Sequence, residues 1–395
     1  MKELTVVHCV GEYLPVTENW TYQLIKHQVG IEKYVASGHF MECPFYLDDT
    51  RYLRRRKILI GTQDNSHYFV NRLFNAIYRK LRQGYSSYVC EQLKEVNVDI
   101  VHSHFATVGW HYQNLATRLE ALHVVSFYGM DYEHIVHTMP EWKARYDSLF
   151  QSADAFICEG SHGASTLKKL GCPEDKISVA KLGVDIALIP FHTREKNENE
   201  LKLLQVASFR EKKGHADCIT AFAEALRNYP NMSLTLIGNG DVDLRKKIHG
   251  MATQLGISDN VHFLPGIDLA LLHETMKSYH VFIQPSRHTL DKDCEGGAPI
   301  VLLDAQATGM PIISTLHCDI PDEVVHGKTG ILCGESETQK MSEAIGVFYK
   351  MPQESYSVFS ANARKHVENT YDIRSNANII VDLYRGLRAS KIPRI

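Results

Sequence analysis

The chain has 395 residues, and at roughly 150 residues per domain this length predicts two large domains. Hydrophobic residues make up 44% and charged residues 23% of the sequence, which is ordinary for a globular protein and excludes a disordered chain or a collagen. The formal net charge of -3 gives no reason to expect nucleic acid as a partner.

Short β-branched runs alternate with helix-length segments along the whole chain, which is typical of βαβ units and parallel sheets. In the first half we predict helices within 18–29, 71–95 and 140–151. The predicted strands there cover residues 4–9, 99–103, 123–127 and 154–159. Residues 185–200 lose this periodicity and turn polar, so they are the predicted linker.

The alternation resumes after the linker, and the chain is helical from about residue 354. The sequence thus predicts an α/β protein with two doubly wound sheets and a cleft at the carboxyl ends of their strands. We expect domains at 1–190 and 191–372, with a C-terminal helix at 373–395 that packs back on the first domain. Strands of the second domain are predicted at 203–207, 233–238, 261–266, 281–286 and 311–315.

Three segments of the second half could bind a ligand at the ends of successive strands. The segment CEGGAPIVLLDAQATGMPIIST (294–315) places Glu295 and two glycines at the predicted start of a helix, with Asp304 about two and a half turns further in. The segment VASFREKKGH (206–215) gathers cations in a strand-to-helix loop, and LIGNGD (236–241) is a Gly-x-Gly turn. Each has an ordinary alternative, a capped helix or a solvated turn. Together they favour a nucleotide diphosphate carrying a sugar.

The order of these segments, followed by VHFLPG, FIQPS and IPDEVVHGKTGILC, resembles glycosyltransferase family 4. The resemblance covers nearly all of 200–370. It is weaker in DIVHSHFATVG (99–109), SFYGMDY (126–132) and CPEDKISVAKLGVD (172–185). It implies the GT-B fold and retaining transfer from a nucleotide sugar. Among family members, the bacterial enzymes of exopolysaccharide and lipopolysaccharide synthesis are the most similar.

The resemblance also implies roles for single residues. Lys213 would contact the donor diphosphate, Glu295 hydroxyls of the transferred sugar, and Asp304 the ribose. The expected catalytic residues are Glu295, Lys213 and Arg210. The full expected donor site comprises Ser208, Arg210, Lys213, Gly238, Gly240, Ser286, Glu295, Gly296, Gly297, Ala298, Ile300, Val301 and Asp304.

The sequence departs from the family pattern at three points. Glu295 and Asp304 are nine residues apart, where the family spaces two glutamates by eight. The usual arginine falls on Ser208, so we expect Arg210 to reach the same phosphate. Tyr128 stands where many members have a histidine before Gly-x-Asp. The expected acceptor side of the cleft consists of Gly11, Glu18, His104, Tyr128 and Asp131.

The 21 histidines raise the question of a metal. His102 and His104 share one face of a predicted strand, but no cysteine or carboxylate follows at zinc-ligand spacing. The resemblance implies a metal-independent enzyme, so we expect no metal and no cofactor.

Residues 51–85 form the one strong charge asymmetry, with nine Lys and Arg against one Asp. A surface helix packed on its domain and a helix that docks on an anionic bilayer both fit this pattern. No apolar run approaches the ~18 residues of a membrane span. The nine cysteines, without a C-x-x-C pair, are typical of reduced thiols. We therefore expect a cytoplasmic protein, with peripheral contact to the inner face of the membrane if the segment docks there.

The function that these observations favour is a retaining glycosyltransferase that transfers a sugar from a nucleotide diphosphate sugar to an acceptor hydroxyl. The expected acceptor is a sugar or a lipid-linked saccharide in cell-surface polysaccharide or glycolipid synthesis. A sugar-nucleotide epimerase with the same fold and a non-catalytic sugar-nucleotide-binding protein are the alternatives. The sequence leaves the base, the sugar and the linkage open.

Overall fold

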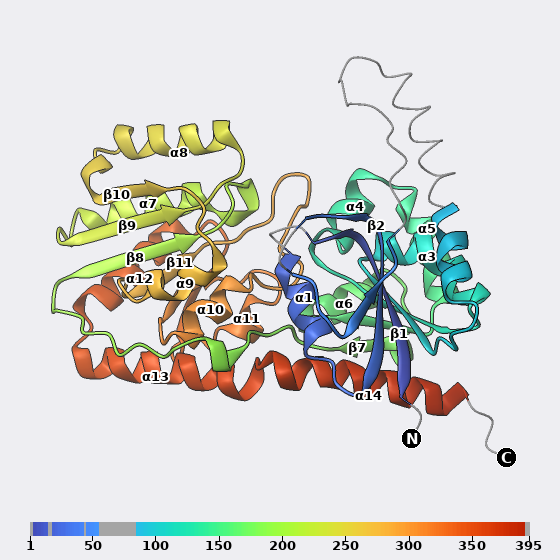
Figure 1. The fold of residues 1–395 in the computed structure, drawn as a ribbon. Helices are drawn as coiled ribbons and strands as arrows, with labels where there is room; N and C mark the ends of the chain where they lie inside the picture. The colour runs from blue at the N-terminus through green and yellow to red at the C-terminus, as the bar shows by residue number, and fades with distance from the viewer. Residues whose placement is uncertain (1–2, 15–17, 43–44, 55–83, 392–395) are drawn as a thin grey trace.

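The computed structural model describes residues 3–14, 18–42, 45–54 and 84–391. Within them the chain forms two α/β domains side by side, each built on one parallel sheet (Figure 1). The predicted fold class, two doubly wound domains, is confirmed. No helix in these ranges is both long and apolar enough to cross a bilayer.

The first sheet has the strand order β3-β2-β1-β4-β5-β6-β7 in the described residues, and its neighbouring strands all pair in parallel. The central strands β4 and β5 are buried at every position, as expected of strands covered by helices on both faces. The strands are β1 Leu4–Tyr13, β2 Ile31–Phe40, β3 Thr50–Tyr52, β4 Ile100–His104, β5 Leu122–Ser126, β6 Ala155–Cys158 and β7 Ile177–Val179. The helices are α1 Asn19–Lys26, α3 Ala106–Arg118, α4 His134–Thr138, α5 Trp142–Ser152 and α6 Ser161–Lys169.

The second sheet has the order β10-β9-β8-β11-β12-β13, again parallel throughout the described pairs. Its strands are β8 Leu201–Val206, β9 Met232–Ile237, β10 Val261–Leu264, β11 Val281–Gln284, β12 Ile312–Thr315 and β13 Gly330–Cys333. Its helices are α7 His215–Leu226, α8 Val242–Gln254, α9 Leu269–Met276, α10 Val301–Ala307, α11 Ile320–Glu323 and α12 Thr338–Lys350.

All nine predicted strands are present, to within a few residues. Four strands escaped prediction, namely β2, β3, β7 and β13. Of the predicted helix at 71–95, residues 84–92 are helical, and residues 55–83 lie outside the described part of the chain.

The predicted linker is held firmly to the second domain rather than solvated. Arg194 is buried, and its guanidinium donates hydrogen bonds to the backbone oxygen of Thr308 at 2.6 Å and to that of Tyr279 at 2.9 Å. Lys196 is also buried and donates to the backbone oxygen of Tyr349 at 3.0 Å. Two cations that look like surface charges in the sequence therefore satisfy backbone carbonyls instead.

The last two helices link the domains along one side of the molecule (Figure 1). Helix α13 (Gln353–Thr370) lies along the second domain, and α14 (Ile373–Lys391) crosses under the first sheet. The apolar face of α14 packs in one cluster with residues of β1, β4, β5 and β6. Its members include Ile373, Ala377, Ile380, Val381 and Tyr384.

This packing predicts that α14 is required for the stability of the first domain. Ile380 is 2% exposed, whereas its neighbour Ile379 is 51% exposed. We expect Ile380→Ala to lower the free energy of unfolding by about 2–5 kcal/mol, because it leaves a cavity. Ile379→Ala should change it by less than about 0.5 kcal/mol. Urea unfolding followed by circular dichroism measures both, and equal effects would contradict the packing.

Candidate active site

Loops at the carboxyl ends of the two sheets meet between the domains. The loop after β5 places Gly129 against the loop after β11, where a Cβ on Gly296 would come within 2.3 Å of the Cα of Gly129. After β6, the backbone N–H of His162 donates to the Asp319 carboxylate at 2.7 Å. Ligands of doubly wound folds bind at this end of the strands, so the candidate site lies where sequence reasoning placed it.

Lys213 and Glu295 form the centre of the site. The Lys213 ammonium lies 2.7 Å from Glu295 Oε2, and the Ser286 hydroxyl donates to Glu295 Oε1 at 2.8 Å. Their side chains come from the ends of two different strands, β8 and β11, and only 17% of Lys213 and 7% of Glu295 is exposed. The fold therefore brings a cation and a carboxylate from two of the predicted segments into contact.

Tight backbone packing brings Lys213 into this position. It ends the short helical turn Glu211–Lys213, and Gly214 follows in the left-handed region with φ 67°. A Cβ on Gly214 would lie 1.8 Å from the backbone oxygen of Pro285, so only glycine fits there. The loop that carries Lys213 is thereby pressed against the loop that carries Ser286.

The charge of Glu295 is set by its neighbours. Burial alone would raise the pKa of Glu295, but the positive charges of Lys213 and Lys212 outweigh it, and the pKa is lowered. Lys212 is held nearby, with its ammonium 2.9 Å from Asp293 Oδ1. Glu295 is therefore an anion that can accept hydrogen bonds from sugar hydroxyls.

The structure corrects the expected position of Glu295 relative to the following helix. Helix α10 begins only at Val301, and residues 295–300 form an irregular loop that contains Gly296 with φ 76°. Asp304 consequently lies in the first turn of α10 rather than two and a half turns in. A Cβ on Gly297 would come within 2.1 Å of a Glu159 carboxylate oxygen, so the loop can pass close to the first domain only as glycine.

Asp304 is buried and has a partner that sequence reasoning missed. The Nε2 of His273 in α9 lies 2.8 Å from Asp304 Oδ1. The third predicted segment, LIGNGD, lies beside the loop after β8, because Gly240 pairs with Phe209 in an isolated bridge. A Cβ on Gly238 would lie 1.9 Å from the backbone oxygen of Ala207, so the second and third segments touch.

The remaining expected donor residues occupy different depths. Gly296 and Gly297 are buried, whereas Ser208, Ala298, Ile300 and Val301 are half-buried. Arg210 is exposed, on the opposite end of its turn from the inward-facing Lys213. The described geometry therefore brings Lys213, Ser286 and Glu295 together and leaves Arg210 outside this cluster.

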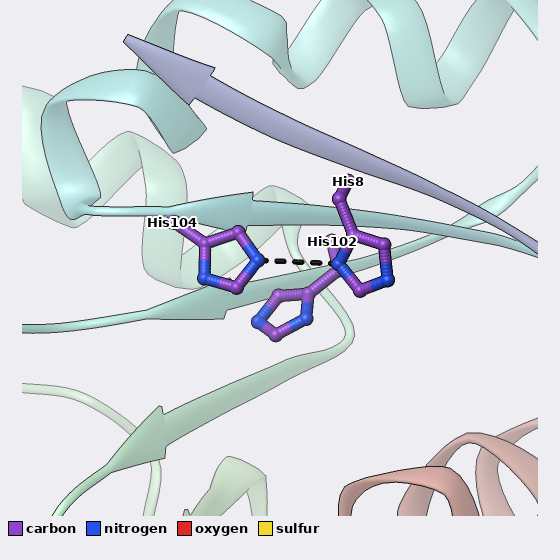
Figure 2. Close-up of side chains that lie close together, drawn as sticks. All are labelled: His8, His102 and His104. Atoms are coloured by element: carbon purple, nitrogen blue, oxygen red, sulfur yellow. Dashed lines mark hydrogen bonds between the residues drawn. The ribbon is translucent and has the colours of Figure 1, made fainter. Parts of the chain in front are cut away.

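On the first-domain side, Tyr128 lies on a layer of buried histidines. Its hydroxyl is 3.2 Å from His104 Nδ1, and the two rings are stacked at an angle of 9°. His104 Nε2 lies 3.2 Å from His8 Nδ1 (Figure 2). The third histidine, His102, has Nδ1 2.6 Å from the Tyr384 hydroxyl and Nε2 2.7 Å from the Ser126 hydroxyl. Burial lowers the pKa of His104 to about 3, so this layer is uncharged.

The expected acceptor residues are therefore not all at the surface of a cleft. His104 is 1% exposed and lies beneath Tyr128, and Asp131 is fully buried. Asp131 Oδ2 accepts the backbone N–H of Ala106 at 2.9 Å and that of Tyr128 at 3.1 Å, so it shapes the loop. Glu18, at the start of α1, is half-buried, and burial raises its pKa to about 7. Gly11, near the end of β1, is half-buried too.

Glu159 is the main residue that the sequence reading missed. It follows β6 directly and faces Gly297 of the other domain. Burial, and then the charges of Asp319 and Glu295, raise the pKa of Glu159 well above its usual value. Its place at the carboxyl end of a parallel strand was the available signal, because functional residues gather there.

Two family models match the chain, one in each half. The model "Glycosyltransferase Family 4" matches residues 35–188, and the model "Glycosyl transferases group 1" matches residues 191–366. Together they span most of both domains.

Curated relatives and solved structures agree with these matches. The putative colanic acid biosynthesis glycosyltransferase WcaL of Escherichia coli is 27% identical over 299 residues, covering 72% of this chain and 70% of the relative. The amylovoran biosynthesis glycosyltransferase AmsK of Erwinia amylovora is 28% identical, covering 64% of this chain and 62% of the relative. The structure of Anabaena HepE in complex with UDP-glucose has a TM-score of 0.72 at 14% identity, covering 97% of this chain and 100% of HepE.

The buried position of Asp131 predicts a pH dependence of stability. Burial raises the pKa of Asp131 to about 7, against about 3.9 in an unfolded chain. Its contribution to stability is therefore complete below about pH 4 and is lost as the pH rises through about 7. Asp131→Asn cannot ionise, so its stability relative to the wild type should increase over that interval, by up to about 1.4 kcal/mol per pH unit. Urea unfolding across this range measures the difference, and a pH-independent difference would exclude the raised pKa.

Proposed function

The chain belongs to the family 4 glycosyltransferases, and we propose that it transfers a sugar, with retention of anomeric configuration, from a nucleotide diphosphate sugar to an acceptor hydroxyl. The observation that carries this proposal is the buried contact of Lys213, Glu295 and Ser286. It combines a cation suited to a diphosphate with a carboxylate suited to sugar hydroxyls. No other cluster in the described residues offers both beside a strand-end loop of glycines.

In the proposed reaction, the bond between the anomeric carbon and the phosphate oxygen breaks while the acceptor oxygen bonds to the same face of that carbon. The proton of the acceptor hydroxyl passes to the leaving phosphate. Lys213 stabilises the negative charge that develops on the diphosphate. Glu295 holds hydroxyls of the transferred sugar, and Asp304 exchanges its contact with His273 for the ribose.

The two domains have separate tasks in this proposal. The second domain holds the donor, and the first presents the acceptor through the loops that carry Tyr128 and Glu159. Tyr128 stands in the place of the usual histidine and is fixed by His104 at 3.2 Å. It cannot act as a base, because burial raises the pKa of Tyr128 well above 10. Its proposed task is to position the sugar.

We further propose a role in the synthesis of a cell-surface polysaccharide or glycolipid, in the cytoplasm and without a metal in catalysis. WcaL and AmsK support it, because they are described as glycosyltransferases of colanic acid and of amylovoran biosynthesis. The UDP-glucose complex of HepE makes UDP-sugars the first donors to examine. The acceptor would be a sugar or a lipid-linked saccharide.

The function is tested by donor screening followed by product analysis. Thermal-shift measurements with UDP-, GDP-, ADP- and dTDP-sugars identify the donor, because a ligand at 100 times its dissociation constant stabilises by about 2.7 kcal/mol. NMR of the anomeric proton then reads the stereochemistry of the transferred sugar. An inverted product would overturn retention, and conversion of the donor alone into an isomer would indicate an epimerase.

Substitution of Lys213 and Glu295 tests their separate roles. A charge-assisted contact contributes about 1.5–3 kcal/mol, so Lys213→Ala should lower donor turnover about ten- to a hundredfold. Glu295→Gln should lower turnover more than it lowers affinity for the bare nucleotide diphosphate, since Glu295 is assigned to the sugar. Lys202→Ala is the matched control, because that ammonium is 48% exposed on β8 and pairs with Glu200. Wild-type turnover in Lys213→Ala would remove Lys213 from the site.

We propose that the basic segment 51–85 docks on an anionic membrane. Most of it, residues 55–83, lies outside the described structure. Arg54, in the described part of the segment, is exposed, and its guanidinium lies over the Tyr46 ring at 4.2 Å. Each basic residue near an anionic surface contributes about 1 kcal/mol.

Reversal of charge in that segment tests the docking. Arg55→Glu, Arg56→Glu and Lys57→Glu together should abolish co-sedimentation with anionic vesicles at low salt and leave transfer to a soluble acceptor unchanged. Reversal of the exposed Lys246, Lys247 and Lys277 in the second domain is the control with the same change in charge. If the wild-type protein does not bind the vesicles, the segment is a solvated surface and the acceptor is a soluble molecule.

A further inference from the structure

A cluster of thiols and imidazoles lies directly behind Glu295. Nitrogen atoms of His288 and His317 and the sulfur of Cys318 all lie within 4.8 Å of one another. His288 is in the loop after β11, and the other two follow β12. These loops carry the walls of the proposed donor site, yet none of the three side chains has a role in it.

One carboxylate orients both imidazoles. The Nδ1 atoms of His317 and His288 lie 2.7 and 2.8 Å from the same oxygen, Glu335 Oε1. The backbone N–H of His288 donates to the other oxygen, Glu335 Oε2, at 2.9 Å. A carboxylate only accepts hydrogen bonds, so both Nδ1 atoms carry the proton. On the side away from Glu335, the Nε2 of His317 is an acceptor, and that of His288 lies 3.5 Å from Glu133 Oε2, a contact that a bound metal would replace.

Sulfur atoms lie on that side. The sulfur of Cys318 is 3.2 Å from His317 Nε2. The thiol of Cys294 is within hydrogen-bonding reach of Cys318 and of His288. Thiolates are metal ligands, so two cysteine sulfur atoms stand beside the two imidazoles.

From this geometry we propose that Cys294, Cys318, His288 and His317 form a structural site for Zn²⁺. Two thiolates and two imidazoles are a recurrent ligand set of tetrahedral structural zinc. A carboxylate that accepts the far N–H of a metal-bound histidine, as Glu335 does here twice, is the usual outer partner of such ligands.

The other histidine cluster lacks these properties. In the group of His8, His102 and His104, both nitrogens of His102 are already hydrogen-bonded, to Tyr384 and Ser126. His8 and His104 bond to each other (Figure 2), and in the described residues this group consists of three histidines without a cysteine or a carboxylate. This group is a hydrogen-bonded layer beneath Tyr128.

The proposed zinc would connect directly to Glu295. In the metal-free geometry the backbone N–H of Glu295 donates to His317 Nε2 at 3.1 Å. A metal bound to His317 Nε2 would replace that hydrogen bond. Through Cys294, the same metal would link the 294–295 backbone to the loop after β12. Zinc would therefore hold the loop that positions Glu295, and it would take no part in the transfer itself.

Cobalt substitution tests the site in the full-length protein. With Co²⁺ as the probe, two thiolate ligands in a tetrahedral site produce strong visible d–d bands and thiolate-to-cobalt charge-transfer absorption. We expect about one Co²⁺ per chain with these bands, and displacement of the bands by Zn²⁺. Cys294→Ser with Cys318→Ser should abolish both bands, whereas Cys90→Ser in the first domain should retain them. Absence of the bands in the wild-type protein would overturn the proposal.

A second measurement needs no substitution and so does not depend on the folding of a variant. Mass spectrometry of alkylated peptides measures the rate at which each thiol of the wild-type protein reacts. Zn²⁺ should slow alkylation of Cys294 and Cys318 at least about tenfold and leave Cys90 unchanged. Equal rates with and without Zn²⁺, or a disulfide between Cys294 and Cys318 in the protein as isolated, would contradict a zinc site. A cysteine variant that no longer binds zinc but still binds the donor would show that the zinc site and the proposed donor site can be tested independently.

Discussion

The ion pair of Lys213 and Glu295 is the contact on which the second domain's site depends. Both side chains are largely buried, and the removal of two charges from water costs several kcal/mol per ion unless they are paired. Pairing across two loops therefore fixes the distance between the ends of β8 and β11. The Ser286 hydroxyl donates a hydrogen bond to the other carboxylate oxygen, so the Glu295 carboxylate has little freedom to rotate. A site held in this way is preorganised before any donor arrives.

The interface of the two domains carries the opposite kind of electrostatics. Burial raises the pKa of Glu159 and of Glu323 well above the usual value, and repulsion from neighbouring carboxylates adds to it. Burial raises the pKa of Asp319 to about 6, against the backbone N–H of His162, which lowers it. Glu159 and Glu323 therefore favour the neutral, protonated form when the domains are together. Separation of the domains would let water reach them, so the closed arrangement and the protonation of these carboxyls are coupled.

Much of this fold could be predicted because buried parallel strands are short β-branched runs between helices. The four missed strands show the limit. In β2 (IEKYVASGHF) the apolar run is broken by Lys33, which is buried although charged because its ammonium pairs with Asp49 and donates to the Ile25 carbonyl. Strands β3 and β7 are only three residues long, and no periodicity can be read from so few positions. Strand β13 (GILC) begins with glycine, a residue that is depleted in strands.

The site was predictable in part for the same kind of reason. Lys213 and Glu295 stand beside glycines in loops that follow strands, and Ser286 lies shortly after β11, so the local pattern places them. The partnership of Asp304 with His273, and that of Gly297 with Glu159, depends on helices and domains that meet only in three dimensions. His104 and Asp131 were expected in the cleft because each follows a predicted strand in the sequence. Their burial follows from β4, whose five residues are all buried, and from two backbone N–H groups that need the Asp131 carboxylate.

Three charged groups of the proposed donor site, Lys213, Glu295 and Asp304, have protein partners, and those partners match the chemistry proposed for the donor. Lys213 contacts a carboxylate where a diphosphate would provide anionic oxygens, and Glu295 accepts from a hydroxyl, that of Ser286, as it would from a sugar. Asp304 contacts an imidazole where a ribose would donate its hydroxyls. Donor binding is then an exchange of like contacts, which leaves no buried charge unpaired at any stage. The same protein partners explain why a site with several charged groups can be stable before the donor binds.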